Sequence, residues 1–394
     1  MTTTRNDQRS DRGPILHLAL ELGLDQWKLA FTIGLAQPPR VRAVAARDRA
    51  AVLREIALAK TRFDLPPDAP VVSCYEAGRD GFWIHRWLTA EGVGNYVIDS
   101  SSIEVNRKQR RAKSDRLDAG ALVRLLVRYE LGEKKSFSVV RVPGEADEDQ
   151  RQLHRELSAL KDERTSLVNQ LKGLLYSQGL RLPTVNAQFP EWLSHARCWD
   201  GSAVGGELQA RLRRTFERWQ QVQGQIGALE AQQRQQIGHD STPQVDLVRR
   251  LMTLKGIGGC GAWMLVKELF GWRRGFNRKQ LGALVGLVPT PFDSGQRRRE
   301  QGISKAGNKR LRRLLVELAW CWLRHQPDSA LSGWFRRRFA EGARLRRIGI
   351  TALARKLLLA LWRYVEQGEV PSGAVLVDWQ PKLRKRRAGP ALVT

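Results

Sequence analysis

The first 130 residues alternate short apolar runs with amphipathic stretches at helical spacing. The runs ILHLALELG, QWKLAFTIG and RVRAVAAR read as strands, and in the first of them apolar side chains fall at every second position. APVVSCYEAG and GNYVIDSSS continue the series, separated by the helical patterns RDRAAVLREIALAK and DGFWIHRWLTAEG. Strands that alternate with helices in this way indicate an α/β domain.

The order of these elements narrows the fold class. Three strands in a meander followed by strand–helix alternation is the ribonuclease H-like order, in which the first and fourth strands are neighbours and the last helix packs across them. The last helix is predicted to begin near Lys113, in KSDRLDAGALVRLLVRYE. The first strand places Glu21 on the face opposite its four leucines, Leu16, Leu18, Leu20 and Leu22.

After the acidic linker at 142–150, the spacing of the leucines changes to that of long helices. Residues 153–174 form a heptad seam, and a second helix from about Arg211 to Gln236 repeats the pattern. Packing alone explains these leucines, and the Gly-, Pro- and Trp-rich segment between the helices would be a hairpin connection or an oligomer contact. The seam consists of Leu153, Leu157, Leu160, Leu167, Leu171 and Leu174.

The chain from residue 245 onward has the pattern of a third, mainly helical unit. LMTLKGIGGCGAWMLVKELFG places a Gly-Ile-Gly turn between two helical patterns, as in a helix-hairpin-helix. In such a turn Lys255, Gly256 and Gly258 would meet a DNA phosphate through backbone N–H groups, although glycine turns also serve packing alone. We therefore expect four segments: an α/β domain at 13–141, a helical coiled coil at 142–244, a C-terminal domain at 245–370 and a basic tail at 371–394.

The charge of the chain indicates its partner. Lys and Arg number 67 against 40 Asp and Glu, which gives a net charge of +27 spread along the sequence. A polyanion is the natural partner, nucleic acid before membrane, because no apolar run approaches the roughly 20 residues that span a bilayer. The polar start predicts a cytoplasmic protein, and the four widely spaced cysteines indicate neither a zinc ribbon nor a disulfide framework.

Four carboxylates are candidates for a metal site. Asp115 and Asp118 lie three residues apart and share one helix face, although aspartates in a first helical turn also favour the helix dipole. In the predicted sheet, Glu21 on the first strand and Glu76 at the end of the fourth would converge on this pair. Four carboxylates around a hard cation describe a Mg²⁺ or Mn²⁺ site suited to phosphoryl transfer. Asp25 is a rival for the first position, but it falls in a predicted turn.

Ser294 raises a separate question, because it directly precedes a run of cations. LGALVGLVPTPFDSG passes two prolines and reaches a Ser-Gly step, which is typical of a loop. Against that reading, Arg297, Arg298 and Arg299 follow at once, and guanidinium groups neutralise the phosphate oxygens that a serine nucleophile must approach. No general base is evident in the sequence beside this serine.

Several motifs in the right order resemble one known family. KSDRLDA after YEAGRDGFW, the leucine-rich helices, LKGIGGCGAW, LVGLVPTPFDSG and GISKAGNKRLRRLL are similar to the DEDD transposases of the IS110 family of bacterial insertion sequences. The resemblance implies a RuvC-like N-terminal domain, a coiled-coil linker and a C-terminal domain with a catalytic serine. It also implies a recombinase near the bacterial nucleoid, guided by a structured RNA that pairs with donor and target DNA. The long heptad helices, and the need of recombination to hold several strands together, suggest a dimer or tetramer.

Matched motif by motif, the resemblance places the acidic tetrad on Glu21, Glu76, Asp115 and Asp118 and the nucleophile on Ser294. Glu21 departs from the Asp usual in the family, and Leu24 replaces its lysine. A nuclease that uses only the carboxylates, or an inactive nucleic-acid-binding relative, are the alternatives. The residues expected to bind nucleic acid are Lys108, Arg110, Arg111, Lys113, Lys255, Gly256, Gly258, Arg297, Arg298, Arg299, Lys305, Asn308 and Lys309.

Overall fold

The computed structural model describes residues 13–103, 115–182, 184–273, 275, 277–294, 297–339 and 342–378. It divides into two compact units, Met1–Val142 and Pro143–Thr394. The first unit is a sheet with helices, and the second is mainly helical, so the predicted mixture of an α/β part and a helical part is confirmed. No helix within the described ranges is long and apolar enough to span a bilayer.

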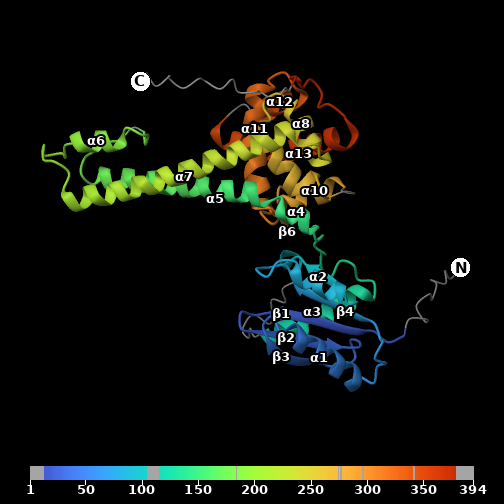
Figure 1. Cartoon of the computed structure of the whole chain (residues 1–394). Helices are drawn as coiled ribbons and strands as arrows, with labels where there is room; N and C mark the ends of the chain where they lie inside the picture. The colour runs from blue at the N-terminus through green and yellow to red at the C-terminus, as the bar shows by residue number, and fades with distance from the viewer. Residues whose placement is uncertain are drawn as a thin grey trace. The chain divides into compact units, whose positions relative to one another are not determined.

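The first unit is built on a five-stranded sheet of order β3-β2-β1-β4-β5 (Figure 1). β1 runs antiparallel to β2 and parallel to β4, and β5 continues the parallel side. The predicted meander is therefore present, and the first and fourth strands are neighbours as expected. The strands are β1 (Leu16–Leu22), β2 (Gln26–Thr32), β3 (Arg40–Ala45), β4 (Val71–Glu76) and β5 (Gly94–Ile98).

Side chains on the two faces of this sheet enter different cores. Leu16, Leu18 and Leu20 pack with apolar residues of α1 (Arg49–Arg62) and α2 (Trp83–Ala90). Ala19 and Cys74 lie on the opposite face and pack with α3 (Asp115–Glu130). This alternation confirms the face assignment that the sequence made for the first strand.

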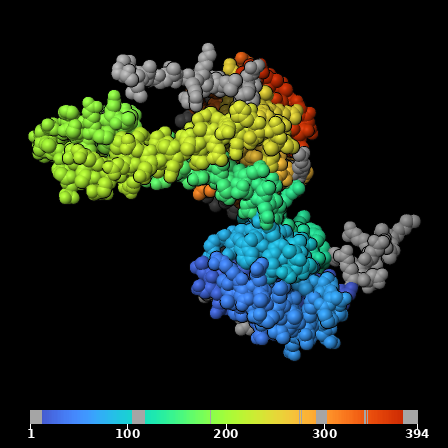
Figure 2. Space-filling view, viewed as in Figure 1, coloured from blue at the N-terminus to red at the C-terminus, as the bar shows by residue number. Residues whose placement is uncertain are grey.

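The second unit begins with α4 (Glu145–Asp149) and an antiparallel helical hairpin. In this hairpin α5 (Gln152–Tyr176) lies beside α7 (Gly206–His239), and α6 (Phe189–His195) lies in the connection (Figure 1). Leu171 and Leu175 pack near the start of α7, whereas Leu157 and Leu160 pack near its middle. The leucine seam of α5 is thus covered by α7 of the same chain, and the hairpin projects from the helical core of this unit as an arm (Figure 2).

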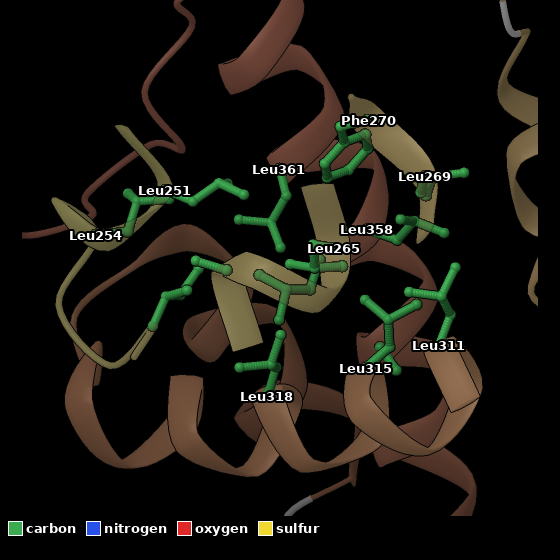
Figure 3. Packing of buried hydrophobic residues seen from close by; sticks show 14 of the residues in the cluster. Leu251, Leu254, Leu265, Leu269, Phe270, Leu311, Leu315, Leu318, Leu358 and Leu361 are labelled. Atoms are coloured by element: carbon green, nitrogen blue, oxygen red, sulfur yellow. The ribbon is translucent and has the colours of Figure 1, made fainter. Parts of the chain in front are cut away.

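The helical core of the second unit gathers one large apolar cluster. Leu265 of α9 lies among leucines of α11 and α13 in this cluster (Figure 3). Charged side chains line the outer faces of the same helices, so the core is closed by packing and the surface is basic. Its helices are α8 (Pro243–Met252), α9 (Gly259–Leu265), the π-helical turn Val266–Phe270, α10 (Arg278–Leu284), α11 (Lys309–His325), α12 (Ala330–Phe339) and α13 (Ala343–Gln367).

A β-hairpin interrupts these helices where the sequence predicted a loop. β6 (Pro289–Ser294) pairs antiparallel with β7 (Arg297–Ile303) and forms a separate two-stranded sheet. The register shifts between Pro289 and Pro291, as expected where prolines cannot donate to a ladder. Ser294 therefore lies on a strand, and the loop prediction for the residues before it was wrong.

Candidate active site

Ser294 is the last residue of β6, at the tip of the hairpin. Its register partner is Arg297, the first residue of β7, and Phe292 pairs with Arg299 two positions further from the tip. Opposed positions share one face of an antiparallel ladder, and so do positions two apart. Positions 294, 297 and 299 therefore lie on one face and position 298 on the other, so the run of arginines is divided between two sides.

The base of the hairpin is fixed by close backbone contacts. Ser304 N–H donates to the Val288 carbonyl at 2.9 Å, Lys305 N–H to Gly286 at 3.2 Å and Asn308 N–H to Leu284 at 2.7 Å. Gly286 has a φ of +66°, and a Cβ at this position would overlap the Ala306 carbonyl oxygen. The loop after β7 thus lies directly against the turn after α10, and it holds both ends of the hairpin together.

The polar residues after the hairpin have different roles in the structure. Lys305, with a φ of +56°, and Lys309 are exposed, as a phosphate-binding side chain requires. Asn308 is instead used inside the protein. Its Oδ1 accepts from the N–H groups of Arg310 and Leu311 and caps α11, and its Nδ2 donates to Glu268 Oε2 at 3.1 Å. A direct contact of Asn308 with nucleic acid therefore competes with these bonds.

Glu268 is a buried carboxylate that the sequence reading did not single out. Its side chain is 2% exposed, and it accepts from His154 Nε2 at 3.0 Å and from Arg155 Nε and Nη2 at 2.9 and 3.2 Å. Burial alone would raise the pKa of Glu268, but the hydrogen bonds from His154 and Arg155, with the charge of Arg155, hold it well below its usual range. Glu268 is thus an ionised junction between the first turn of α5 and the loop after the hairpin.

The glycine turn at Lys255–Gly258 lies between α8 and α9, as predicted. Gly256 has a φ of +95°, and a Cβ there would lie 2.9 Å from His325 Cβ, so both conformation and space require glycine. Lys255 N–H donates to the Val375 carbonyl at 3.1 Å, and Gly258 is the N-cap of α9. Because that N–H is used inside the protein, a phosphate would meet Lys255 through its exposed side chain.

Three of the four predicted carboxylates belong to one end of the sheet in the first unit. Leu20 pairs with Tyr75 across the parallel strands β1 and β4, so Glu21 and Glu76 are the next residues on adjacent strands. Both lie two positions after residues that pack against α3, namely Ala19 and Cys74. The two glutamates therefore share the sheet face that α3 covers.

The start of α3 lies at the same end of the sheet. Cys74 Sγ donates to the Leu122 carbonyl at 4.0 Å. Glu76 is about 7 Å beyond Cys74 along β4, and Asp118 is about 6 Å before Leu122 along α3. α3 runs opposite to β1, because its last residue, Glu130, interacts electrostatically with His17 near the start of β1. Burial lowers the pKa of His17, and the charge of Glu130 partly opposes this shift.

The described side chains at this end of the sheet do not form a metal site. Within the described part of the chain, no three His, Cys, Asp or Glu side chains are arranged to hold a metal ion. Asp115 is the first residue of α3, and its side chain lies outside the part of the chain that the structure describes. Asp25 lies in the turn between β1 and β2, as predicted. The four cations at Lys108, Arg110, Arg111 and Lys113 fall outside the described residues.

Comparison with known proteins identifies the family. A sequence model described as Transposase IS116/IS110/IS902 family matches residues 248–332. A putative transposase of Sinorhizobium fredii, y4rJ, is 40% identical over 382 residues, which cover 93% of this chain and 96% of that protein. The chain belongs to the IS116/IS110/IS902 family of transposases. The transposase for insertion sequence element IS1328 of Yersinia enterocolitica is 28% identical over 260 residues, 66% of this chain and 73% of that protein.

The stretch that matches the family model contains the features described for the second unit. Residues 248–332 include the glycine turn, Glu268, the β6–β7 hairpin and Asn308. The second unit also holds most of the charge of this transposase, with 43 Lys and Arg against 23 Asp and Glu in Pro143–Thr394. Enzymes that act on DNA meet a polyanion, and this excess of cations matches that partner.

Proposed function

We propose that this transposase mobilises an insertion sequence by cutting and rejoining DNA through a covalent intermediate on Ser294. The observation that carries the proposal is the place of this serine. It ends β6 at the tip of a two-stranded hairpin, directly opposite Arg297. A tip is a position that can enter a DNA groove, and the facing arginine position supplies charge for the phosphate.

The proposed reaction is a transesterification. The Ser294 hydroxyl oxygen forms a bond to phosphorus as the bond from phosphorus to one deoxyribose oxygen breaks. The hydroxyl proton ends on the released deoxyribose oxygen, and a phosphoserine–DNA ester remains. Attack of a deoxyribose hydroxyl of another strand on this ester reverses the step and joins the new strand. The bond energy is conserved, so the reaction needs no nucleotide cofactor.

The arginines of β7 would divide the work between them. Positions 297 and 299 share the ladder face of Ser294, so Arg297 and Arg299 are proposed to bind the oxygens of the scissile phosphate. Arg298, Lys305 and Lys309 would bind neighbouring phosphates, which position the strand without reading its sequence. Lys255, Gly256 and Gly258 would hold a further phosphate at the glycine turn.

A divalent cation is proposed to bind the carboxylates at the end of the sheet, because their oxygen atoms are the ligands that such a cation takes. Glu21, Glu76 and Asp118 converge there by backbone position, Asp115 lies one turn before Asp118, and all four offer the hard oxygen ligands that Mg²⁺ and Mn²⁺ take. A cation held by these residues would neutralise phosphate charge as a Lewis acid. Glu21 reaches about one methylene further than an aspartate would, so this chain would hold the ion with a longer arm on β1.

A structured RNA encoded with the element is the proposed guide, because the resemblance to RNA-guided relatives implies it. If base pairing reads the sequence, the protein needs only to hold backbones. The net charge of +27 suits a protein that binds both an RNA and two DNA duplexes. Lys108, Arg110, Arg111 and Lys113 would bind RNA or DNA beside the carboxylates.

The test is a search for the covalent intermediate. The full chain is incubated with Mg²⁺, RNA transcribed from the flanks of the element and labelled donor and target DNA, then examined for a denaturant-resistant protein–DNA adduct. We expect an adduct that Ser294→Ala abolishes and that Ser304→Ala, at the base of the same hairpin, retains. Cleavage that forms no adduct, survives Ser294→Ala and is lost in Asp118→Asn would instead identify a nuclease that uses only the carboxylates. Binding with no strand transfer in Mg²⁺ or Mn²⁺ would identify an inactive relative.

A further inference from the structure

We propose that Glu268 is a positioning residue for strand transfer, which fixes the base of the β6–β7 hairpin against the arm and thereby sets the place of Ser294. The inference rests on the proposed function, because it assigns a role to the serine. Glu268 lies on the π-helical turn between α9 and α10. It accepts hydrogen bonds from the first turn of α5 on one side and from Asn308 on the other.

Because the hairpin extends from a fixed base, a small rotation at the base displaces its tip. Asn308 is fixed to Leu284 and Glu268 at the base, whereas Ser294 lies at the tip. Six residues of strand separate the base from the tip, which corresponds to about 17 Å. A rotation of about 5° at the base therefore moves the tip by roughly 1.5 Å, and a misplacement of about 1 Å costs on the order of 10²-fold in rate.

The cost of burying this carboxylate also points to a role beyond packing. A charge with 2% exposure is expensive to desolvate, and an apolar residue of similar volume would often stabilise the fold as well. Glu268 is retained with four donated hydrogen bonds from three residues, two of them on α5. What an apolar residue could not supply is the directional bond to Asn308.

The adjacent residue provides a matched control. Lys267 is also buried in the same π-helical turn, and its Nζ donates to Gln150 and Gln244, both at 2.6 Å. These bonds fasten the linker before α5 and do not reach the hairpin. Lys267→Met therefore removes a buried polar group of the same segment while it leaves Asn308 and the hairpin untouched.

The experiment is a reciprocal exchange of donor and acceptor. In Glu268→Gln, the amide oxygen can keep the bonds from His154 Nε2 and Arg155 Nε, but an NH2 donor then replaces the oxygen that accepts from Asn308 Nδ2. Asn308→Asp keeps the cap on α11 but loses the donated bond. In the double variant the new amide at position 268 can donate to the new carboxylate at position 308, while the amide oxygen still accepts from His154 and Arg155. The rate of phosphoserine adduct formation is measured at saturating RNA and DNA, with separate binding and thermal-unfolding measurements.

We expect each single variant to slow adduct formation about 10²-fold with DNA affinity changed less than twofold, and the double variant to recover at least tenfold. Lys267→Met is expected to stay within threefold of the native rate. Asn308→Ser, which keeps a capping oxygen without the amide donor, should behave as Asn308→Asp does and serves if Glu268→Gln does not fold. Unchanged rates in the single variants, losses matched by Lys267→Met, or no recovery in the double variant would overturn the inference. The native chain and Ser294→Ala in the same assay separate this outcome from failure of the proposed function. That failure appears as no adduct in the native chain or as an adduct that persists in Ser294→Ala, whereas failure of the inference alone leaves a native adduct that Ser294→Ala abolishes.

Discussion

The close approach at Gly286 allows one prediction to be worked through in numbers. In Gly286→Ala, the new Cβ would overlap the Ala306 carbonyl, well inside the 3.0 Å that real Cβ contacts keep. The loop after β7 must therefore move by about 1 Å, because backbone cannot fold away as a flexible side chain can. That movement breaks the three backbone hydrogen bonds at 2.7, 2.9 and 3.2 Å which hold the hairpin base.

The magnitude follows from these two effects. An alanine at a φ of +66° costs on the order of 1 kcal/mol in strain. Three lost hydrogen bonds add about 3 kcal/mol at roughly 1 kcal/mol each. Gly201→Ala is the matched control, since Gly201 has a φ of +81° but nothing within 4 Å of its Cβ position. The difference between the two variants, about 3 kcal/mol, therefore isolates the close approach and corresponds to on the order of 10²-fold in local opening.

Amide hydrogen exchange measured by mass spectrometry tests this prediction. In Gly286→Ala we expect peptides covering 297–308 to exchange on the order of 10²-fold faster, with those from α5 unchanged. Gly201→Ala should leave the hairpin peptides at the native rate. Equal exchange of residues 297–308 in both variants would refute the reasoning, because strain alone would then account for the effect.

Two further predictions rest on charge. Replacing Arg297, Arg298 and Arg299 together by alanine should reduce the magnitude of the slope of log affinity against log salt for duplex DNA by about 2.7, at roughly 0.9 per phosphate contact. A salt titration of binding measures this slope, which would be unchanged if these arginines contact no phosphate. In the first unit, burial, then the charge of Glu130 and the bond that Tyr96 donates to it at 3.1 Å, raise the pKa of Tyr96 to about 12. The neutral phenol thus stabilises the fold below about pH 10, and this contribution is lost as the pH rises through 12. Absorbance at alkaline pH should show late ionisation assignable to Tyr96, which occurs earlier in Glu130→Gln; no change in that variant would count against the contact.

The elements of the first unit and the arm could be predicted because burial of one side gives their apolar residues a regular spacing. Leu16, Leu18 and Leu20 face one core while Ala19 faces another, so the alternation of the first strand records two packed faces. The leucines of α5 keep a heptad spacing because α7 covers them along its length. Patterns of this kind survive in the sequence whenever one side of an element is apolar.

The hairpin was missed because its strands have no such side. β7 carries RRREQGI, and β6 contains two prolines, so neither strand shows apolar alternation. The available signal was the two-residue step between Ser294 and Arg297 with a glycine in it, which is typical of tight hairpins. The ladder lies in its own two-stranded sheet, apart from the large sheet that the α/β pattern predicted.

Glu268 was missed for a different reason. Its neighbours in sequence are apolar or basic, and an acid among them reads as one polar turn of a helix. Its hydrogen-bond partners lie 114 positions away at His154 and 40 positions away at Asn308. A single sequence holds no period that connects such distances, although an acid within the mostly apolar stretch MLVKELFG is a signal for a buried charge.

The structure also changes the basis for expecting more than one copy of the chain. The heptad helices had suggested an oligomer, but the seam of α5 packs on α7 of the same chain and needs no second copy. The proposed chemistry supplies another argument. Each strand held as a phosphoserine ester occupies one nucleophile, and the chain offers one candidate, Ser294. In that chemistry, exchange between donor and target would hold at least two cut ends at once, so we expect at least two chains to act together.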